Sequence, residues 1–283
     1  MDPFLIAADI DRYLREDLAL GDITTEAIFS PTETVIARFV AKDDLVCAGM
    51  DLVAAEVFKR KNASCICRFA ATDGTRAQPG DTLLEVWGPT RDLLTAERTA
   101  LNLVQRLSGI ATLTSRFVEK VAGYPVKITD TRKTTPGLRL LEKYAVRVGG
   151  GYNHRLCLSD GILIKDNHIA ACGSIARAVQ KVRDRVPHTI KVEVETTDLD
   201  EVRQCLECRV EIIMLDNMSL EMMREAVGLV NGRALVEASG GVNLESVERI
   251  AATGVDIISI GALTHSAPAS DISMRLEPCV QES

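Results

Sequence analysis

Cationic side chains gather in one stretch of this chain, residues 127–168, where they could bind a small polyanion. The stretch holds eight Lys and Arg residues against four Asp and Glu, whereas the whole chain has a net charge of −7. The stretch is therefore +4 and the remainder of the chain −11. A local cationic cluster on an acidic protein favours a receptor for a small anion over a nucleic-acid-binding protein, which would be basic overall.

Two arginines of this stretch, Arg132 and Arg155, lie where we expect loops, and we interpret them as ligand-binding residues. A planar guanidinium group binds a carboxylate through two parallel hydrogen bonds. His154 and Lys165 accompany them, although His154 could also be a hydrogen-bonded structural histidine. One carboxylate cannot pair with all of these cations, so the sequence predicts a ligand that carries more than one carboxylate group.

Three further cations of the stretch recur every four residues after Pro136: Arg139, Lys143 and Arg147. Proline is common in the first turn of a helix, so we expect a helix to begin near Pro136. We interpret the three side chains as a solvated face of that helix and not as ligand-binding groups.

Polar or glycine-rich residues follow each of six predicted strands. In α/β barrels the active site lies where strands end at their carboxyl side. One Glu or Asp at such a point could be a helix cap or a surface charge, but six polar strand ends indicate a charge-binding rim. The strand ends are Asp130 to Lys133, Lys165 to His168, Glu195, Asp216, Ser239 to Gly241, and Gly261 with Ala262.

Two of these strand ends, in residues 237–241 and 259–263, predict a phosphate site. Glycine lets backbone N–H groups approach a phosphate, and the start of the following helix favours the anion. Glu195 and Asp216 carry charge of the wrong sign for a phosphate. Carboxylates suit hydroxyl groups or a hard metal ion instead.

The elements that must position these residues form a repeated strand–helix pattern from about residue 126 onward. The last five strands begin 21 to 28 residues apart, with helix start signals at Ser174, Asp198, Ser219 and Asn243. Alternating strands and helices predict a parallel sheet. About six units are visible, so we expect an incomplete, TIM-like α/β barrel in residues 116–268. The six predicted strands are 126–129, 162–165, 190–195, 211–216, 234–239 and 256–261.

Residues 1–115 predict an α+β sandwich domain instead. A first helix (3–20) precedes short strands at 38–42, 65–71 and 82–88, which are separated by Gly and Pro turns. We expect residues 93–123 to form a pair of helices interrupted near Gly109. The tail, residues 269–283, is predicted to rejoin this domain, with 269–277 as an edge strand.

Composition indicates a globular protein, with 46% apolar and 26% charged residues. No run of 18 uninterrupted apolar residues and no signal peptide is visible, so we expect a cytoplasmic protein without a membrane partner. Eight cysteines are scattered along the chain, and we interpret them as reduced thiols. The pairs Cys65/Cys67 and Cys205/Cys208 lie in different predicted domains and lack a nearby histidine, which disfavours a zinc site.

Several long motifs resemble the quinolinate phosphoribosyltransferase family, the carboxylating nicotinate-nucleotide pyrophosphorylases. The resemblance runs from about Glu16 to Leu276. The motifs are TDTRKTTPGLRLLEKYAV, GGGYNHR and DGILIKDNHI in the cationic stretch, GDITTEA at 21–27, AERTALNLVQRLSGIAT at 96–112 and GALTHSAPASDIS at 261–273.

The resemblance implies transfer of a phosphoribosyl group from phosphoribosyl pyrophosphate (PRPP) to quinolinate with loss of CO₂, which yields nicotinate mononucleotide for NAD biosynthesis. It implies Mg²⁺ as cofactor, bound by Glu195 and Asp216 through water. The quinolinate pocket it implies consists of Arg98, Thr131, Arg132, His154, Arg155 and Lys165. The PRPP site it implies consists of Lys133, Glu195, Asp216, Ser239, Gly240, Gly241, Ile260, Gly261 and Ala262. The catalytic residues it implies are Lys133, Lys165, Glu195 and Asp216.

We also expect a homodimer, or an oligomer built from dimers, with shared active sites. The helix that carries Arg98 spans about 20 Å over residues 95–108, at ~1.5 Å per residue. If this helix packs outside its own barrel, the side chain of Arg98 cannot easily reach the pocket at the barrel's rim. A two-fold dimer, which the resemblance also implies, presents the arginine to the partner's pocket.

Three alternatives remain open from the sequence. The first is a paralogue of the same fold associated with molybdenum transport, against which the set Arg132, His154, Arg155 and Lys165 argues. The second is a phosphosugar isomerase or aldolase that uses Lys165 to form a Schiff base. The third is a barrel that binds the polyanion without turning it over.

Overall fold

The computed structural model describes residues 2–278, which divide into two compact units. The first unit holds the described residues up to 113, residues 140–150 and those from 267 onward; the second holds 114–139 and 151–266. The division predicted from sequence assigned residues 140–150 to the barrel. They group with the first unit because buried Glu142 accepts hydrogen bonds from Arg106, at 2.8 and 3.1 Å.

The second unit is built on a parallel sheet of six strands within the described residues. The order is β6-β11-β10-β9-β8-β7, so β6 and β7 are the two edges and the barrel is incomplete. This confirms the predicted fold class. The strands are β6 (Lys127–Thr129), β7 (Ile162–Ile164), β8 (Val192–Thr196), β9 (Ile212–Asp216), β10 (Leu235–Ser239) and β11 (Ile257–Ser259).

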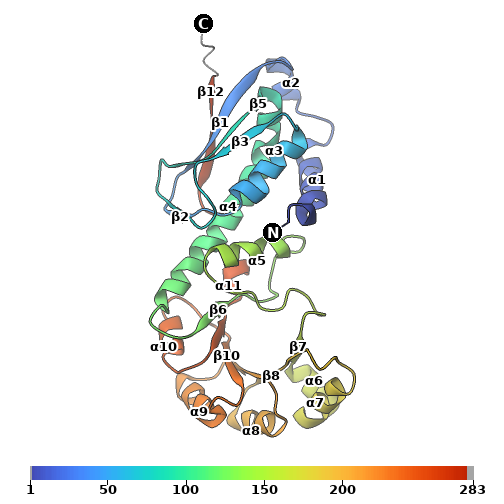
Figure 1. Ribbon diagram of the computed structural model, residues 1–283, viewed down its shortest axis with the longest axis vertical. Helices are drawn as coiled ribbons and strands as arrows, with labels where there is room; N and C mark the ends of the chain where they lie inside the picture. The colour runs from blue at the N-terminus through green and yellow to red at the C-terminus, as the bar shows by residue number, and fades with distance from the viewer. Residues whose placement is uncertain (1, 279–283) are drawn as a thin grey trace. The chain divides into compact units, whose positions relative to one another are not determined.

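Helices follow these strands, and Figure 1 shows α8 to α10 outside the sheet. Three begin at predicted caps, since the side chains of Ser174, Asp198 and Ser219 each accept a backbone N–H three residues on. The helices are α6 (Asp166–Cys172), α7 (Ile175–Arg183), α8 (Leu199–Glu207), α9 (Leu220–Val230), α10 (Val247–Ala251) and α11 (Ala262–His265).

The first unit contains an antiparallel sheet in the order β12-β1-β5-β3. Its strands are β1 (Thr34–Ala41), β3 (Ile66–Phe69), β5 (Thr82–Pro89) and β12 (Ile272–Pro278), with a small pair β2 (Leu45–Val46) and β4 (Arg76–Ala77). The predicted edge strand of the tail is β12; residues 279–283 lie outside the described part. The helices are α1 (Phe4–Leu18), α2 (Ile23–Ile28), the π-helical turn η1 (Met50–Ala54) and α3 (Ala55–Lys61).

The helix pair predicted for residues 93–123 is wrong. A single helix, α4 (Thr90–Lys120), runs without interruption through Gly109. The glycine serves packing and does not break the helix, because a Cβ at this position would lie 1.9 Å from the carbonyl oxygen of Pro268. A backbone approach this close leaves no room for any side chain.

The solvated face predicted for α5 (Arg139–Val148) is also largely wrong. Lys143 is buried, with 3% of its surface exposed, and Arg139 is half-buried; only Arg147 is exposed. Four-residue spacing shows that side chains share a helix face. It does not show whether that face is covered.

The described residues contain neither a membrane-spanning helix nor a disulfide. Among the described helices none is long and apolar enough to cross a membrane. The seven described cysteines are free thiols, and Cys279 lies outside the described residues. Burial raises the pKa of Cys47 and of Cys205 to about 12, so neither is a reactive thiolate at neutral pH.

We predict that Gly109→Ala lowers the free energy of unfolding by about 2–3 kcal/mol, because the new methyl group overlaps the backbone at Pro268. Urea unfolding of the purified chain measures the change. The matched control is Gly228→Ala in α9, where an added Cβ meets nothing within 4 Å among the described residues. The control should be neutral or stabilising by up to about 1 kcal/mol, and equal effects of the two changes would contradict the packing role.

Candidate active site

A cavity of about 590 Å³ opens at the carboxyl ends of the parallel strands, entirely within the second unit. It gathers the predicted site residues except Arg98, Ile260, Gly261 and Ala262. Its lining also includes four residues that the sequence analysis did not name. The lining residues are Thr131, Arg132, Lys133, His154, Arg155, Leu163, Lys165, Glu195, Met214, Asp216, Asn217, Ser239, Gly240, Gly241 and Ser259.

A buried aspartate joins the two loops that carry the cavity's arginines. Asp130, with none of its surface exposed, follows β6 and accepts the backbone N–H of His154 at 2.9 Å. It also accepts the side-chain amide of Asn153 at 2.6 Å. A buried carboxylate must be hydrogen-bonded, so these contacts fix residues 153–155 beside the loop of Arg132.

Arg139 supports the same loop and was missed in the sequence. Its guanidinium donates to the hydroxyl of Thr134 at 2.8 Å and to the carbonyl oxygens of Arg132 and Leu156, both at 3.3 Å. Helical spacing disguised this role. The position of this cation two residues after Pro136-Gly137 was the one signal available.

The guanidinium groups of Arg132 and Arg155 are only partly hydrogen-bonded by the described residues. Arg155 donates to the carbonyl of Gly161 at 3.0 Å, but the buried Nε–H of each arginine has no hydrogen-bond partner among residues 2–278. Burial and the nearby positive charge of Arg132 hold the pKa of Arg155 below its usual value. Buried donors of this kind are costly unless an anion satisfies them.

Lys165 and Glu195, which the sequence analysis assigned to different subsites, form an ion pair of 2.6 Å across the ends of β7 and β8. The lysine side chain is half exposed at 48%, while the glutamate is 13% exposed. The backbone N–H of Lys165 donates to Nδ1 of His168, which fixes the start of α6. The pair therefore brings together two residues that the sequence analysis expected in different subsites.

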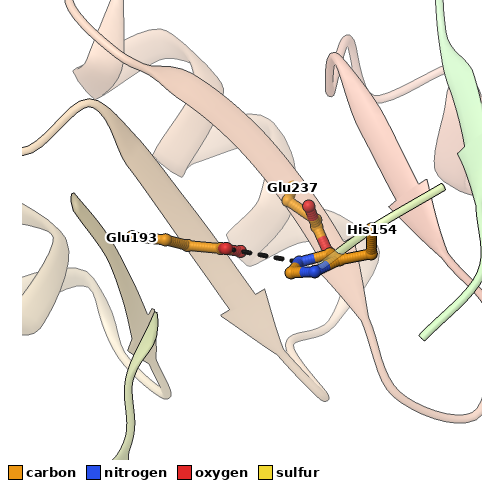
Figure 2. A group of neighbouring side chains, drawn as sticks. All are labelled: His154, Glu193 and Glu237. Atoms are coloured by element: carbon orange, nitrogen blue, oxygen red, sulfur yellow. Dashed lines mark ion pairs between the residues drawn. The ribbon is translucent and has the colours of Figure 1, made fainter. Parts of the chain in front are cut away.

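His154 points into the barrel interior, toward Glu193 of β8 and Glu237 of β10 (Figure 2). Its Nε2 lies 3.2 Å from Glu193 Oε2 and 3.6 Å from Glu237 Oε1. Burial lowers the pKa of His154, but the hydrogen bond to Glu193 and the glutamate charges outweigh this, so the net shift is upward. Burial and then the charge of Glu193 raise the pKa of Glu237 to about 7. The sequence analysis missed both glutamates.

Glycine is required at position 240 by the neighbouring strand end. A Cβ on Gly240 would lie 2.2 Å from the side-chain oxygen of Asn217, and its φ of +99° also disfavours other residues. Asn217 donates to Asp216 Oδ2 at 3.0 Å. The glycine therefore lets Asn217 and Asp216 approach the 239–241 loop.

The predicted phosphate residues of the last loop differ in access. Thr264 donates its hydroxyl to the carbonyl of Lys133 at 2.8 Å, and a Cβ on Gly261 would lie 3.0 Å from Cδ of Lys133. Lys133 is thus anchored against this loop. Ile260 has a buried side chain, and its N–H donates to Thr129, so it offers the cavity neither group.

Comparisons with known proteins agree over both units. The chain matches two family models, "Quinolinate phosphoribosyl transferase, C-terminal domain" over residues 110–275 and "Quinolinate phosphoribosyl transferase, N-terminal domain" over residues 22–108. It is 47% identical to the nicotinate-nucleotide pyrophosphorylase [carboxylating] of Mycobacterium leprae, covering 94% of this chain and 95% of that protein.

A probable nicotinate-nucleotide pyrophosphorylase [carboxylating] of Bacillus subtilis is 44% identical, over 94% of this chain and 91% of the relative. The crystal structure of NadC from Streptococcus pyogenes superposes with a TM-score of 0.95 at 44% identity and covers 98% of each chain. These matches span both units and include the strand ends that line the cavity. The chain therefore belongs to the quinolinate phosphoribosyltransferase family.

Proposed function

We propose that the protein transfers the phosphoribosyl group of PRPP to the ring nitrogen of quinolinate and releases pyrophosphate and CO₂, forming nicotinate mononucleotide for NAD biosynthesis. One observation carries the proposal most directly. Arg132 and Arg155 line one cavity, and each directs a buried N–H that has no partner among residues 2–278. A ligand with two adjacent carboxylates satisfies both donors.

The acceptor region consists of Thr131, Arg132, His154, Arg155 and Lys165. The guanidinium groups bind the two carboxylates, and Lys165 either holds the carboxylate that departs or relays a proton. Since the residues are anchored through Asp130 and Arg139, the pyridine ring is held in one orientation before reaction. Orientation of this kind removes much of the entropic barrier.

The donor region consists of Lys133, Glu195, Asp216, residues 239–241, Gly261 and Ala262. Glu195 and Asp216 end adjacent parallel strands and face the cavity, and such carboxylates suit a Mg²⁺ ion that keeps several waters. When bound there, the ion would neutralise the charge of the departing pyrophosphate. Lys133 contributes a further positive charge to the phosphates.

In the proposed reaction the pyridine nitrogen attacks C1 of PRPP, and the bond to pyrophosphate breaks with its electron pair. The ring nitrogen becomes cationic and stabilises the carbanion left when the adjacent carboxylate departs as CO₂. A proton then completes the ring. Catalysis rests on alignment and electrostatic stabilisation, and no covalent enzyme intermediate is needed.

The ion pair of Lys165 argues against the aldolase alternative. A Schiff-base lysine must present a neutral amine, usually through an apolar pocket or a second cation. Lys165 instead lies 2.6 Å from the carboxylate of Glu195 and is engaged in an ion pair. The cavity also contains more cations than a sugar phosphate requires.

We propose a cytoplasmic homodimer with shared active sites, in which Arg98 completes the partner's pocket. Every cavity-lining residue belongs to the second unit, whereas Arg98 lies on α4 in the first unit and is exposed. Apolar side chains of the same unit are also exposed, among them Phe4 at 83% and Ile23 at 84%. A second copy could cover such surface.

The first test compares acceptors. Quinolinate should be turned over with PRPP and Mg²⁺, whereas nicotinate, which lacks the second carboxylate, should not, because one buried cation would stay unpaired at a cost of several kcal/mol. Pyrophosphate release measures both reactions. Comparable turnover of nicotinate would overturn the assignment.

The second test separates the two carboxylates. Asp216→Asn should raise the KM for PRPP and weaken Mg²⁺ dependence while leaving quinolinate affinity within about twofold. Glu195→Gln should also raise the KM for PRPP and weaken the Mg²⁺ dependence. It should tighten quinolinate binding by roughly two- to fivefold, since it removes a negative charge beside Lys165. Calorimetric titration with quinolinate distinguishes them. Loss of quinolinate affinity in both variants, with PRPP binding unchanged, would show that the subsites are exchanged.

The third test concerns Arg98. Arg98→Ala and Lys165→Ala homodimers should each be nearly inactive, but exchange of their subunits should restore activity, because each mixed dimer has one intact site. Random exchange yields about a quarter of the wild-type activity. No recovery, once mass spectrometry has verified the exchange, would place Arg98 in its own subunit's site or outside the site.

A further inference from the structure

Two buried glutamates lie inside the barrel beyond the donor and acceptor residues. In β8 the buried Val192 and Val194 alternate with Glu193, and in β10 Val236 and Ala238 alternate with Glu237. Successive strand residues face opposite sides of a sheet, so the apolar residues cover one face and both glutamates point to the other. Glu193 is 4% and Glu237 2% exposed.

These carboxylates are expensive to bury, and His154 is the group they share. The Nε2 atom of His154 lies 3.2 Å from Glu193 Oε2 and 3.6 Å from Glu237 Oε1 (Figure 2), and the hydroxyl of Ser259 also interacts with Glu237. Oε1 of each glutamate is buried without a hydrogen-bond partner within the described chain. An incompletely bonded buried carboxylate attracts a proton donor strongly, and the Nε2–H of His154 is that donor.

The other ring nitrogen has the opposite role. Nδ1 of His154 accepts the backbone N–H of Arg155 at 2.7 Å, so Nδ1 must present a lone pair. An imidazole that donates at Nε2 and accepts at Nδ1 is the neutral Nε2–H tautomer, so the contact at Nδ1 opposes the second proton that the nearby glutamates favour. The tautomer therefore connects the barrel interior to the main chain of Arg155.

We propose that Glu193 and Glu237 are positioning residues, which hold His154 as the Nε2–H tautomer and thereby fix the backbone of Arg155 and the direction of its guanidinium. The proposal rests on the proposed function for its kinetic consequence only. Arg155 also donates to Gly161, so its guanidinium is fixed at two points once its backbone is held. A quinolinate carboxylate then meets a donor already in place.

A bound metal ion is the competing explanation, because the nitrogen and oxygen atoms of this cluster lie within 4.8 Å of one another. A metal on Nε2 would leave no proton there. The ring's protonation thus separates the explanations. Elemental analysis that finds one divalent ion per chain, lost in Glu237→Gln, would overturn the proposal.

Nitrogen NMR of the intact protein tests the tautomer without any activity assay. The chain contains four histidines, so ¹⁵N-histidine labelling gives few signals, and His154→Gln identifies the one of interest. We expect a protonated Nε2 and an unprotonated Nδ1. A protonated Nδ1 in the wild type would refute the proposal even if quinolinate is turned over, and the expected tautomer would stand even if it is not.

Kinetics tests the consequence. Glu193→Leu removes the acceptor and should raise the KM for quinolinate roughly tenfold with little change for PRPP, whereas Glu193→Gln keeps an acceptor oxygen and should stay within about twofold. Glu225→Gln, on the exposed face of α9, is the matched control and should have no effect. Circular dichroism checks folding. An unchanged quinolinate KM in folded Glu193→Leu would contradict the positioning role.

Discussion

The mutual repulsion of two arginines, Arg132 and Arg155, is the constraint on which the site depends. Positive charges held close together in a partly buried cavity separate unless their main chain is anchored. Asp130 provides the anchor, because one buried carboxylate bonds the segment of Asn153 and His154 to the end of β6. The unsatisfied guanidinium donors are thereby kept ready for an anion with two carboxylates.

The order of strands in the same barrel separates the proposed acceptor region from the proposed donor region. The ends of β8, β9 and β10 are neighbours in the sheet and contribute Glu195, Asp216 and the 239–241 loop. Lys165 at the end of β7 meets Glu195 and joins the regions. Deeper in the barrel, Glu193 and Glu237 support the histidine that precedes Arg155.

Local patterns in the sequence predicted the strands of the parallel sheet, three of four helix caps and most of the cavity lining, because period-two apolar runs and capping side chains are encoded by near neighbours. The fourth cap was wrong, since α10 begins after Ser246 and not after Asn243. Contacts between distant residues were not predictable in the same way. Gly109 was expected to interrupt a helix, but the close approach of the Pro268 backbone is what requires glycine there. The spacing of Lys143 indicated a helix face but did not show that this face is buried. The sequence analysis placed Lys165 and Glu195 in different subsites and did not predict their ion pair.

In our proposal one cavity performs both phosphoribosyl transfer and decarboxylation of a dicarboxylate. It is tested most directly by incubating the purified protein with PRPP, Mg²⁺ and quinolinate labelled in the carboxylate next to the ring nitrogen, and by measuring labelled CO₂ and pyrophosphate together. Labelled CO₂ and pyrophosphate should form in equal amounts, together with nicotinate mononucleotide. Pyrophosphate without labelled CO₂, or no reaction at all, would contradict it.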